Sequence, residues 1–208
     1  MQLIIGTKAW STWSLRPWLV LKHSGLAFEE MLIALRWDGT TEAISAVSAS
    51  GKVPVLRDGD IVVWDSLAIS EYVAEKSTVP LWPASQAARA EARAAAAEMH
   101  SGFSALRNQC PMDIGLRTTV TVDEALAKDL TRLVSLFTSL RHKHKDQGPW
   151  LCGTWSIADA FYAPVATRVR SYGLDLGAYG DDGSAKTYVE TLLAEPAFLE
   201  WEKEALAG

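Results

Sequence analysis

The sequence predicts two structural units, a small α/β unit followed by an all-helical unit. Short apolar runs alternate with helix-like stretches up to residue 76, whereas only helical patterns and loops follow residue 85. Composition fits an ordinary folded protein, because 49% of the 208 residues are hydrophobic and 22% are charged. We expect a first domain over 1–77, a linker over 78–85 and a helical domain over 86–208.

The first unit has the order β-α-β-α-β-β-α. The expected elements are a strand at 2–6, a helix at 11–24, a strand at 28–35, a short helix at 40–48, strands at 53–56 and 61–64, and a helix at 65–76. Gly25 is a suitable helix terminator, and Asp58-Gly59 suits a tight hairpin turn over 57–60. The first two strands can be parallel across a helix and the last two form a hairpin, so the sequence predicts a mixed four-stranded sheet with helices.

The second unit begins after a segment that contains Pro80 and Pro83, which favour a linker. Nine of the fourteen residues over 84–97 are alanine, the residue with the highest helix propensity. We expect helices at 86–107, 123–145, 156–172, 184–194 and 196–206.

Charge and motifs exclude several classes of protein. The net charge of −5 argues against a nucleic-acid surface, and no apolar run reaches the ~18 residues that suggest a membrane span. The N-terminus lacks a secretory signal, so cytoplasm is the expected location. Cys110 and Cys152 are too few for a metal quartet or a disulfide framework, and we expect buried or partly buried free thiols and no metal.

Four short segments have a pattern that suits a site or a cap. Ser11 and Ser14 stand at a helix start, where a hydroxyl can bind an anion or, more commonly, cap the helix. Val53-Pro54 opens a strand and leaves the Val53 backbone available for pairing, unless it is simply an edge-strand proline. Asp65-Ser66 stands at another helix start, which suits a ligand carboxylate and ammonium, or an N-cap. Ser156 and Asp159 form a capping box, a structural signal.

Taken in this order, the four segments resemble those of the cytosolic glutathione transferases over nearly the whole chain. Ser11-Thr12-Trp13-Ser14-Leu15-Arg16 resembles the Ser-x-Cys-Ser-x-Arg stretch of the zeta class, the maleylacetoacetate isomerases. Residues 52–56 resemble the family's Val-Pro strand with its cis-proline, 65–69 its Gln/Glu-Ser-x-Ala-Ile segment, and 153–159 its capping-box signature. The resemblance implies a thioredoxin-like first domain and a helical-bundle second domain.

The resemblance also implies a glutathione site. Ser11 would donate its hydroxyl to the glutathione sulfur, and Val53, before Pro54, would pair through its backbone with the cysteinyl part. Lys52 would lie near the glycyl carboxylate, whereas Asp65 and Ser66 would hold the γ-glutamyl ammonium and carboxylate. Glutathione is therefore the expected cosubstrate.

The expected chemistry is activation of a thiol. A thiol with a pKa of about 8.5 is only about 3% thiolate at pH 7. Lowering that pKa by about two units needs about 2.7 kcal/mol. One charge-assisted hydrogen bond contributes roughly 1.5–3 kcal/mol and a helix N-terminus roughly 0.3–1 kcal/mol, so a hydroxyl at a helix start suffices.

Two residues depart from the zeta pattern. Trp13 replaces its cysteine, which argues against thiol–disulfide exchange, and Asp65 replaces the usual Gln or Glu. Thr12 and Ser14 remain alternatives to Ser11. A second substrate would lie between the domains, with possible wall residues at Trp13, Arg107 and its loop 108–112, Tyr162, Arg168 and Arg170.

The resulting hypothesis is a glutathione transferase that adds the thiolate to small electrophiles in detoxification, with a homodimer implied by the family. A zeta-type glutathione-dependent cis–trans isomerase, a non-catalytic protein that binds glutathione or apolar ligands, and a reductase of peroxides or disulfides are the alternatives.

Overall fold

Four short strands form one mixed sheet in the computed structural model, which describes residues 1–207. The first part of the chain contains β1 (Gln2–Gly6), α1 (Thr12–Ser24), β2 (Glu29–Ile33), α2 (Thr40–Ser45), β3 (Val55–Asp58), β4 (Ile61–Trp64) and α3 (Ser66–Lys76). The strand order is β2-β1-β3-β4. β1 pairs with β2 in parallel, and β3 is antiparallel to both β1 and β4, which confirms the predicted mixed sheet.

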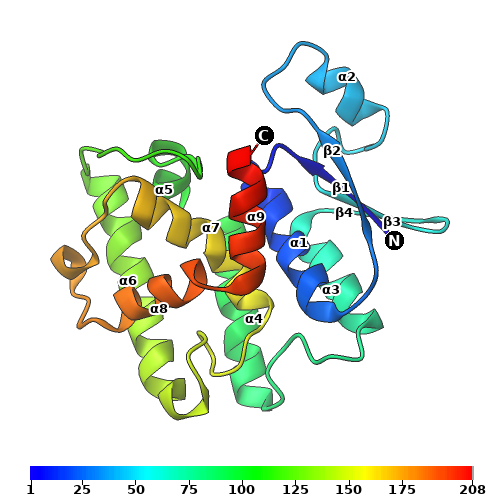
Figure 1. The fold of residues 1–208 in the computed structure, drawn as a ribbon. Coiled ribbons are helices and arrows are strands. Elements are labelled where there is room, and N and C mark those ends of the chain that lie inside the picture. The colour runs from blue at the N-terminus through cyan, green and yellow to red at the C-terminus, as the bar shows by residue number, and fades with distance from the viewer. Residues whose placement is uncertain (208) are drawn as a thin grey trace.

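The two faces of the sheet are covered by different helices. Leu3, Ile5 and Leu56 belong to the main hydrophobic core with residues of α1 and α3. Ile4 and Val55, which alternate with them, pack against Ile33 and with Ile44 of α2 in a smaller cluster. Figure 1 shows α2 apart from α1 and α3, on the far side of the strands. The strand expected at 53–56 begins two residues later, so the Val53-Pro54 peptide lies just before it.

The rest of the described chain is helical. Its elements are α4 (Gln86–Ser101), α5 (Ser104–Gln109), α6 (Glu124–His144), α7 (Ile157–Ser171), α8 (Ser184–Leu193), α9 (Pro196–Ala207) and short 3-10 helices at Lys145–Gln147 and Leu176–Tyr179. The prediction of a single helix at 86–107 was wrong. The chain leaves the helical conformation after Ser101, Phe103 takes a left-handed φ of 55°, and α5 begins at Ser104. Helix α4 ends just before Gly102, which lies very close to the Glu98 carbonyl. A Cβ at position 102 would be only 2.8 Å from the Glu98 oxygen, so this close approach requires glycine.

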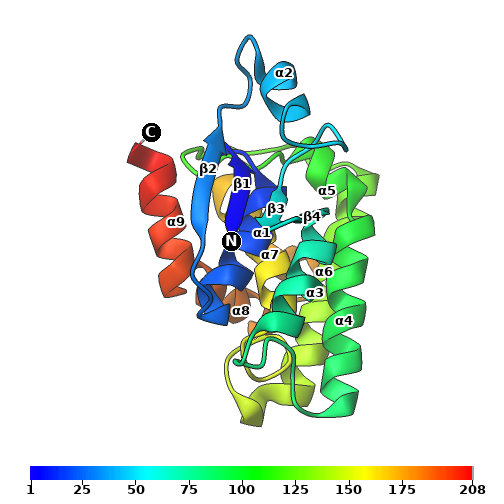
Figure 2. The same cartoon turned by 90° about the vertical axis from the view of Figure 1, so that its right-hand side faces the viewer.

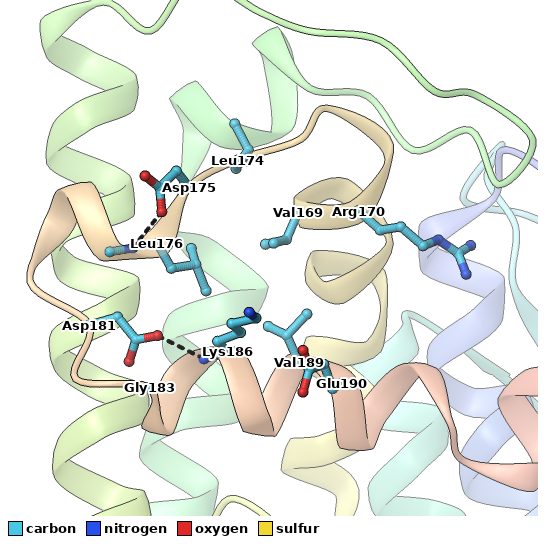
Figure 3. A pocket seen from close by; sticks show the side chains of 11 residues that line it. Val169, Arg170, Leu174, Asp175, Leu176, Asp181, Gly183, Lys186, Val189 and Glu190 are labelled. Carbon is cyan, nitrogen blue, oxygen red and sulfur yellow. Dashed lines mark hydrogen bonds between the residues drawn. The ribbon is translucent and has the colours of Figure 1, made fainter.

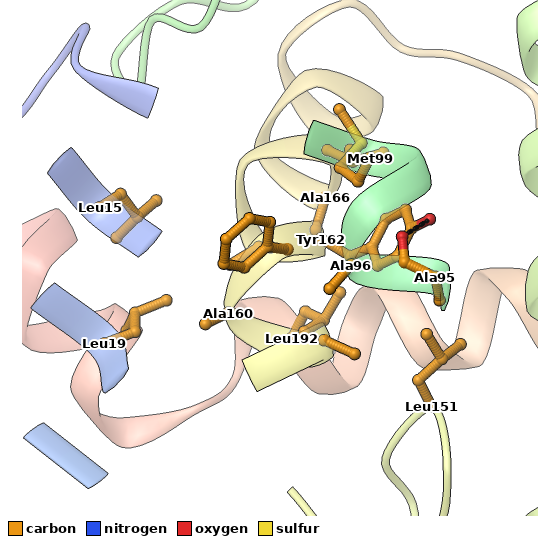
Figure 4. Packing of buried hydrophobic residues seen from close by; sticks show 14 of the residues in the cluster. Leu15, Leu19, Ala95, Ala96, Met99, Leu151, Ala160, Tyr162, Ala166 and Leu192 are labelled. Carbon is orange, nitrogen blue, oxygen red and sulfur yellow. Dashed lines mark hydrogen bonds between the residues drawn. The ribbon is translucent and has the colours of Figure 1, made fainter. Parts of the chain in front are cut away.

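Helix α7 is the centre of the molecule. Residues 157–168 of this helix are all buried, and α7 packs against α1 on one side and α4 on another. Figure 4 shows both contacts: Leu15 and Leu19 of α1 lie on the side of Ala160 of α7, whereas Tyr162 of α7 points the other way, toward Ala95 of α4. The small alanines allow these helices to approach closely, so one core joins the sheet to the helical part.

The last helix, α9, attaches to the first part of the chain, beside α1 (Figure 1) and near β2 in the turned view (Figure 2). The Trp201 indole donates to the Lys8 carbonyl over 3.0 Å, and its ring lies edge-on to Trp18 at 5.2 Å. Lys22 of α1 pairs with Glu200 at 2.7 Å. The C-terminal segment therefore adds a second contact between the two parts, beside the core that α1 and α7 form.

Both cysteines are free and buried, as expected. Burial raises the pKa of Cys110, and it raises the pKa of Cys152 to about 12. Neither thiol is available as a thiolate near neutral pH.

Candidate functional site

Two cavities adjoin at Trp13, at the start of α1. The first, of about 460 Å³, is here called the Ser66 cavity. It is lined by Trp13, Ser50, Lys52, Val53, Pro54, Trp64, Asp65 and Ser66. The second, of about 500 Å³, is called the arginine cavity. It is lined by Trp10, Thr12, Trp13, Arg36, His100, Ser104, Arg107, Asn108, Pro111, Met112 and Arg168. The site residues at 52–54 and 65–66 thus meet in one cavity, and Trp13 forms a shared wall with the other.

The Ser66 cavity has free hydrogen-bonding groups. The Val53-Pro54 peptide bond is cis, and none of the hydrogen bonds in the described part of the chain uses the Val53 N–H or C=O. Ser66, at the first position of α3, is 1% exposed, yet its hydroxyl has no partner within residues 1–207. A buried polar group without a partner is costly, so this hydroxyl is suited to a ligand.

Asp65 caps α3 and keeps one oxygen for another partner. Its Oδ1 accepts from the backbone N–H groups of Leu67 and Ala68, at 2.8 and 3.2 Å. Its Oδ2 lies 3.2 Å from Nε2 of His100. Its φ of 74° is in the left-handed region, a strained backbone for a residue with a side chain. The cap and the binding interpretations are therefore compatible, because the two oxygens have different partners.

Ser11 does not cap its helix through its side chain. It occupies the N-cap position of α1, but its hydroxyl makes no cap hydrogen bond to the backbone. Instead it donates to the Ser14 hydroxyl over 2.7 Å, and Ser14 accepts from the Gly6 N–H over 3.1 Å. Both serines are buried, whereas Thr12 lines the arginine cavity. The positive end of the α1 dipole lies at this hydroxyl pair.

Arg16 is the charged residue that the sequence analysis did not single out. Its side chain is fully buried, with its guanidinium 4.3 Å from the Trp13 ring centroid and 4.8 Å from that of Phe161. None of its three nitrogens has a hydrogen-bond partner within the described residues. Burial, with the nearby charges of Arg168 and Arg107, lowers its pKa to about 9. The signals in the sequence are its position as the arginine of the Ser-x-Cys-Ser-x-Arg pattern and a charge within an otherwise apolar run.

The arginine cavity carries positive charge. Arg168 is buried, donating to the carbonyls of Cys110 and Pro164, and burial together with Arg107 lowers its pKa to about 10. Arg36 comes from the loop after β2, where its φ is 58° and its guanidinium lies 4.5 Å from the Trp10 ring. Three arginines line this cavity, and no carboxylate is among its lining side chains within residues 1–207.

The structure places two expected wall residues elsewhere. Tyr162 is fully buried in the core and donates to the Ala95 carbonyl over 3.0 Å, because its ring packs between α4 and α7. Arg170 pairs with Glu202 of α9 and lines a different cavity of about 390 Å³ (Figure 3). In that view its side chain extends away from Asp175 and Asp181, whose carboxylates accept from backbone N–H groups. Arg107 and Arg168 do lie at the cavity next to Trp13.

Ser156 and Asp159 lie away from both cavities. They form a capping box at the start of α7. The Asp159 carboxylate also accepts from the Leu151 N–H and the Tyr188 hydroxyl, at 2.9 and 2.8 Å.

Comparisons with known proteins agree with this arrangement. Residues 10–76 match the family model "Glutathione S-transferase, N-terminal domain". Glutathione S-transferase 1 of Dianthus caryophyllus is 30% identical over 184 residues, which cover 86% of this chain and 82% of that protein. A probable maleylacetoacetate isomerase of Caenorhabditis elegans is 28% identical, covering 90% and 86%. The chain belongs to the glutathione S-transferase family, with a relationship to the zeta class.

A solved structure shows the same fold. A glutathione transferase homologue from Burkholderia, determined with bound glutathione, has a TM-score of 0.75 and 25% identity, covering 100% of this chain and 98% of that one. Within residues 1–207, no helix has the length and apolar character to cross a membrane, and no group of three or more His, Cys, Asp or Glu side chains is arranged to hold a metal ion.

Proposed function

We propose that this protein is a glutathione transferase whose Ser66 cavity binds glutathione and whose arginine cavity binds the electrophile. The observation that carries this proposal is the unpartnered, buried Ser66 hydroxyl at the start of α3. A helix start with a free hydroxyl is a suitable site for a carboxylate. The bound glutathione of the Burkholderia homologue supports the choice of ligand.

The tripeptide fits the cavity group by group. The γ-glutamyl carboxylate lies on Ser66 and the ammonium group on Oδ2 of Asp65, while the cysteinyl backbone pairs with the free N–H and C=O of Val53. Lys52 is an exposed cation at the cavity rim, where it attracts the glycyl carboxylate. This placement directs the sulfur toward Trp13 and the start of α1.

Ser11 donates to the sulfur in the proposed mechanism. Its hydroxyl turns from Ser14 to the sulfur and, with the helix N-terminus, stabilises the thiolate, to which the buried charge of Arg16 adds a favourable field. The thiolate attacks an electrophilic carbon, the new S–C bond forms, and the leaving group departs with the bonding electrons. The thiol proton passes to solvent, so the protein needs no general base.

A second candidate reaction is glutathione-dependent cis–trans isomerisation of an acidic compound. Three arginines around one cavity favour a substrate with carboxylate groups. The similarity to a probable maleylacetoacetate isomerase also supports an isomerisation reaction. In this reaction the thiolate adds to a conjugated double bond, the carbon–carbon single bond rotates, and the thiolate leaves again.

The test of the thiolate mechanism compares Ser11→Ala with Thr12→Val. The substrates are glutathione with 1-chloro-2,4-dinitrobenzene. We expect Ser11→Ala to lower kcat/KM about 10- to 100-fold near pH 6.5 and to raise the pKa of the bound thiol, because a charge-assisted hydrogen bond contributes roughly 1.5–3 kcal/mol. Thr12→Val should change kcat/KM by less than about threefold. The reverse ranking would assign the role to Thr12.

The non-catalytic alternative has a distinct outcome. A protein that is retained on glutathione-agarose but converts neither chloronitrobenzenes nor acidic cis-alkenes would be a binding protein only.

We also propose a homodimer. Ile61, Val62 and Trp64 of the edge strand β4 are each about half exposed, and a second copy would cover them. Light scattering coupled to size-exclusion chromatography distinguishes a dimer from a 22.7 kDa monomer.

A further inference from the structure

His100 stands between the two cavities and contacts groups of both. It lies in the last turn of α4 and lines the arginine cavity, yet its Nε2 lies 3.2 Å from Oδ2 of Asp65 in the Ser66 cavity. We propose that His100 is a positioning residue of the glutathione subsite: its neutral imidazole holds Asp65 for the γ-glutamyl ammonium group, and its protonation weakens glutathione binding. This inference rests on the proposed function.

Geometry leaves one oxygen of Asp65 for a ligand. Because Oδ1 already accepts two N–H groups of α3, the ammonium group must share Oδ2 with His100. A carboxylate oxygen has two lone pairs, so a neutral imidazole N–H and an ammonium N–H can both be accepted. Asp is one methylene shorter than the Gln or Glu of the family pattern, and a donor from α4 keeps this short carboxylate in place.

Packing fixes the imidazole ring. Trp13 lies edge-on to it with ring centroids 5.3 Å apart, and the Phe161 ring is 6.1 Å away. When Nε2 carries the proton that is donated to Asp65, Nδ1 is a bare acceptor. Nδ1 is buried and has no hydrogen-bond partner within residues 1–207. A second proton would therefore place a buried N–H where no acceptor exists.

The charges around the ring also oppose a second proton. The guanidinium of Arg16 lies 4.3 Å from the Trp13 ring, which itself contacts the imidazole. Arg107 of α5 donates to the His100 carbonyl over 3.1 Å. Arg36 and Arg168 line the arginine cavity together with His100. Within residues 1–207, Asp65 is the carboxylate paired with the ring. Burial lowers the pKa of His100, with Arg16 and Arg107 adding to the effect and Asp65 opposing it.

Glutathione and the proton thus compete for one carboxylate. At neutral pH the imidazole is uncharged, and Asp65 is free to pair with the ammonium group. Below the His100 pKa, an imidazolium neutralises Asp65 and repels the incoming ammonium. Binding must in turn lower the His100 pKa, since the two effects are linked. Affinity should rise with pH through the range below about 6.5 and then stay constant.

S-methylglutathione tests this competition, because it has no thiol to titrate. We expect calorimetric titration to give about three- to fourfold weaker binding near pH 5.5 than near pH 7.5, because a pKa difference of about one unit between free and bound protein reaches its full tenfold effect only well below both pKa values. His100→Asn keeps a donor that does not titrate, so its affinity should vary less than about twofold over this range. His142→Asn is the matched control: it removes an exposed histidine paired with Asp182 at 2.8 Å and should keep the wild-type profile.

An NMR titration of the wild-type protein gives an independent measurement, which does not depend on how a variant folds. The His100 pKa should fall when S-methylglutathione binds. An unmoved His100 pKa, or a His100→Asn profile as steep as that of the wild type, would overturn the inference. Asp65→Ala separates the two proposals. If this variant binds S-methylglutathione as the wild type does, the proposed glutathione site is wrong. If it binds more weakly but the affinity of the wild-type protein does not change with pH, only the role of His100 is wrong.

Discussion

Arg16 is a buried positive charge whose contacts are two aromatic rings rather than a carboxylate. Burying an unpaired charge costs several kcal/mol, only part of which is offset by cation–π contacts. The chain therefore retains a residue that opposes folding, at the helix whose start we assign to the thiolate. A functional requirement accounts for such a residue better than a structural one does.

Arg16→Met should separate stability from activity. Removing the charge while keeping a side chain of similar length should raise the free energy of unfolding in urea by about 1–2 kcal/mol. It should also raise the pKa of bound glutathione and lower kcat/KM about tenfold, since about 1.4 kcal/mol of thiolate stabilisation is lost. Arg93→Met is the control, because it removes a positive charge at an exposed arginine that lies 3.6 Å from Glu71. It shows how much of the effect comes from the change in net charge. A large loss of stability in Arg16→Met would show that Arg16 holds the fold instead.

The sequence alone predicted only part of the candidate site. Val53, Asp65 and Ser66 were predictable as site candidates because strand and helix starts leave backbone groups free, a local property. His100 was not, since it has no motif and its role depends on which helices meet. Arg16 belongs to the Ser-x-Cys-Ser-x-Arg pattern, but its burial against Phe161 of α7 also depends on which helices meet. Tyr162 was misplaced for the same reason: helical spacing cannot tell a cavity-facing ring from a core ring.

One buried carboxylate, that of Asp159, closes the start of α7. Asp159 is almost fully buried, and its carboxylate accepts from Ser156, Leu151 and Tyr188. Burial raises its pKa, although all these donors act in the opposite direction. The cap thus joins α7, α8 and the loop before α7 at one carboxylate.

Asp159→Asn should therefore destabilise the protein by about 2–4 kcal/mol, because the amide NH2 would face N–H or O–H donors and leave them buried without an acceptor. Asp123→Asn is the comparison. Asp123 caps α6 through one bond to the Leu126 N–H at 2.8 Å, in an exposed position, and should lose at most about 1 kcal/mol. Equal effects in chemical denaturation would contradict the view that burial makes the α7 cap different.

Helix positions were largely predictable from the sequence, whereas their ends were less so. Alanine content and apolar spacing placed α6, α7, α8 and α9 within a few residues, and they placed the start of α4. The break between α4 and α5 at Gly102 was missed, because one glycine inside a helical pattern does not by itself end a helix. That break bears on the proposed electrophile site, since α5 carries Arg107, whose guanidinium lies 5.5 Å from the Trp13 ring.

One hydrophobic core spans the sheet and the helices. Helix α7 contacts α1, and α9 packs on Lys8 and Trp18. We therefore expect the two parts to unfold together. Tryptophan fluorescence and far-UV circular dichroism should give coincident transitions. Two separated transitions would show that the parts are independently stable.

Trp201→Ala tests the docking of α9. Loss of a fully buried indole and its bond to the Lys8 carbonyl should cost about 3–5 kcal/mol. The transition should stay single, because the core between α1 and α7 is intact. A second, earlier transition in this variant would mean that α9 is what couples the parts.

The three guanidinium groups around one cavity have a practical consequence. Without an acidic occupant they repel one another, so chloride, sulfate and phosphate from the medium are attracted to the same place. Such ions would act as weak competitive inhibitors, and kinetic constants measured in concentrated phosphate would understate the turnover of carboxylate compounds. Assays in dilute zwitterionic buffer should reveal the preference most clearly.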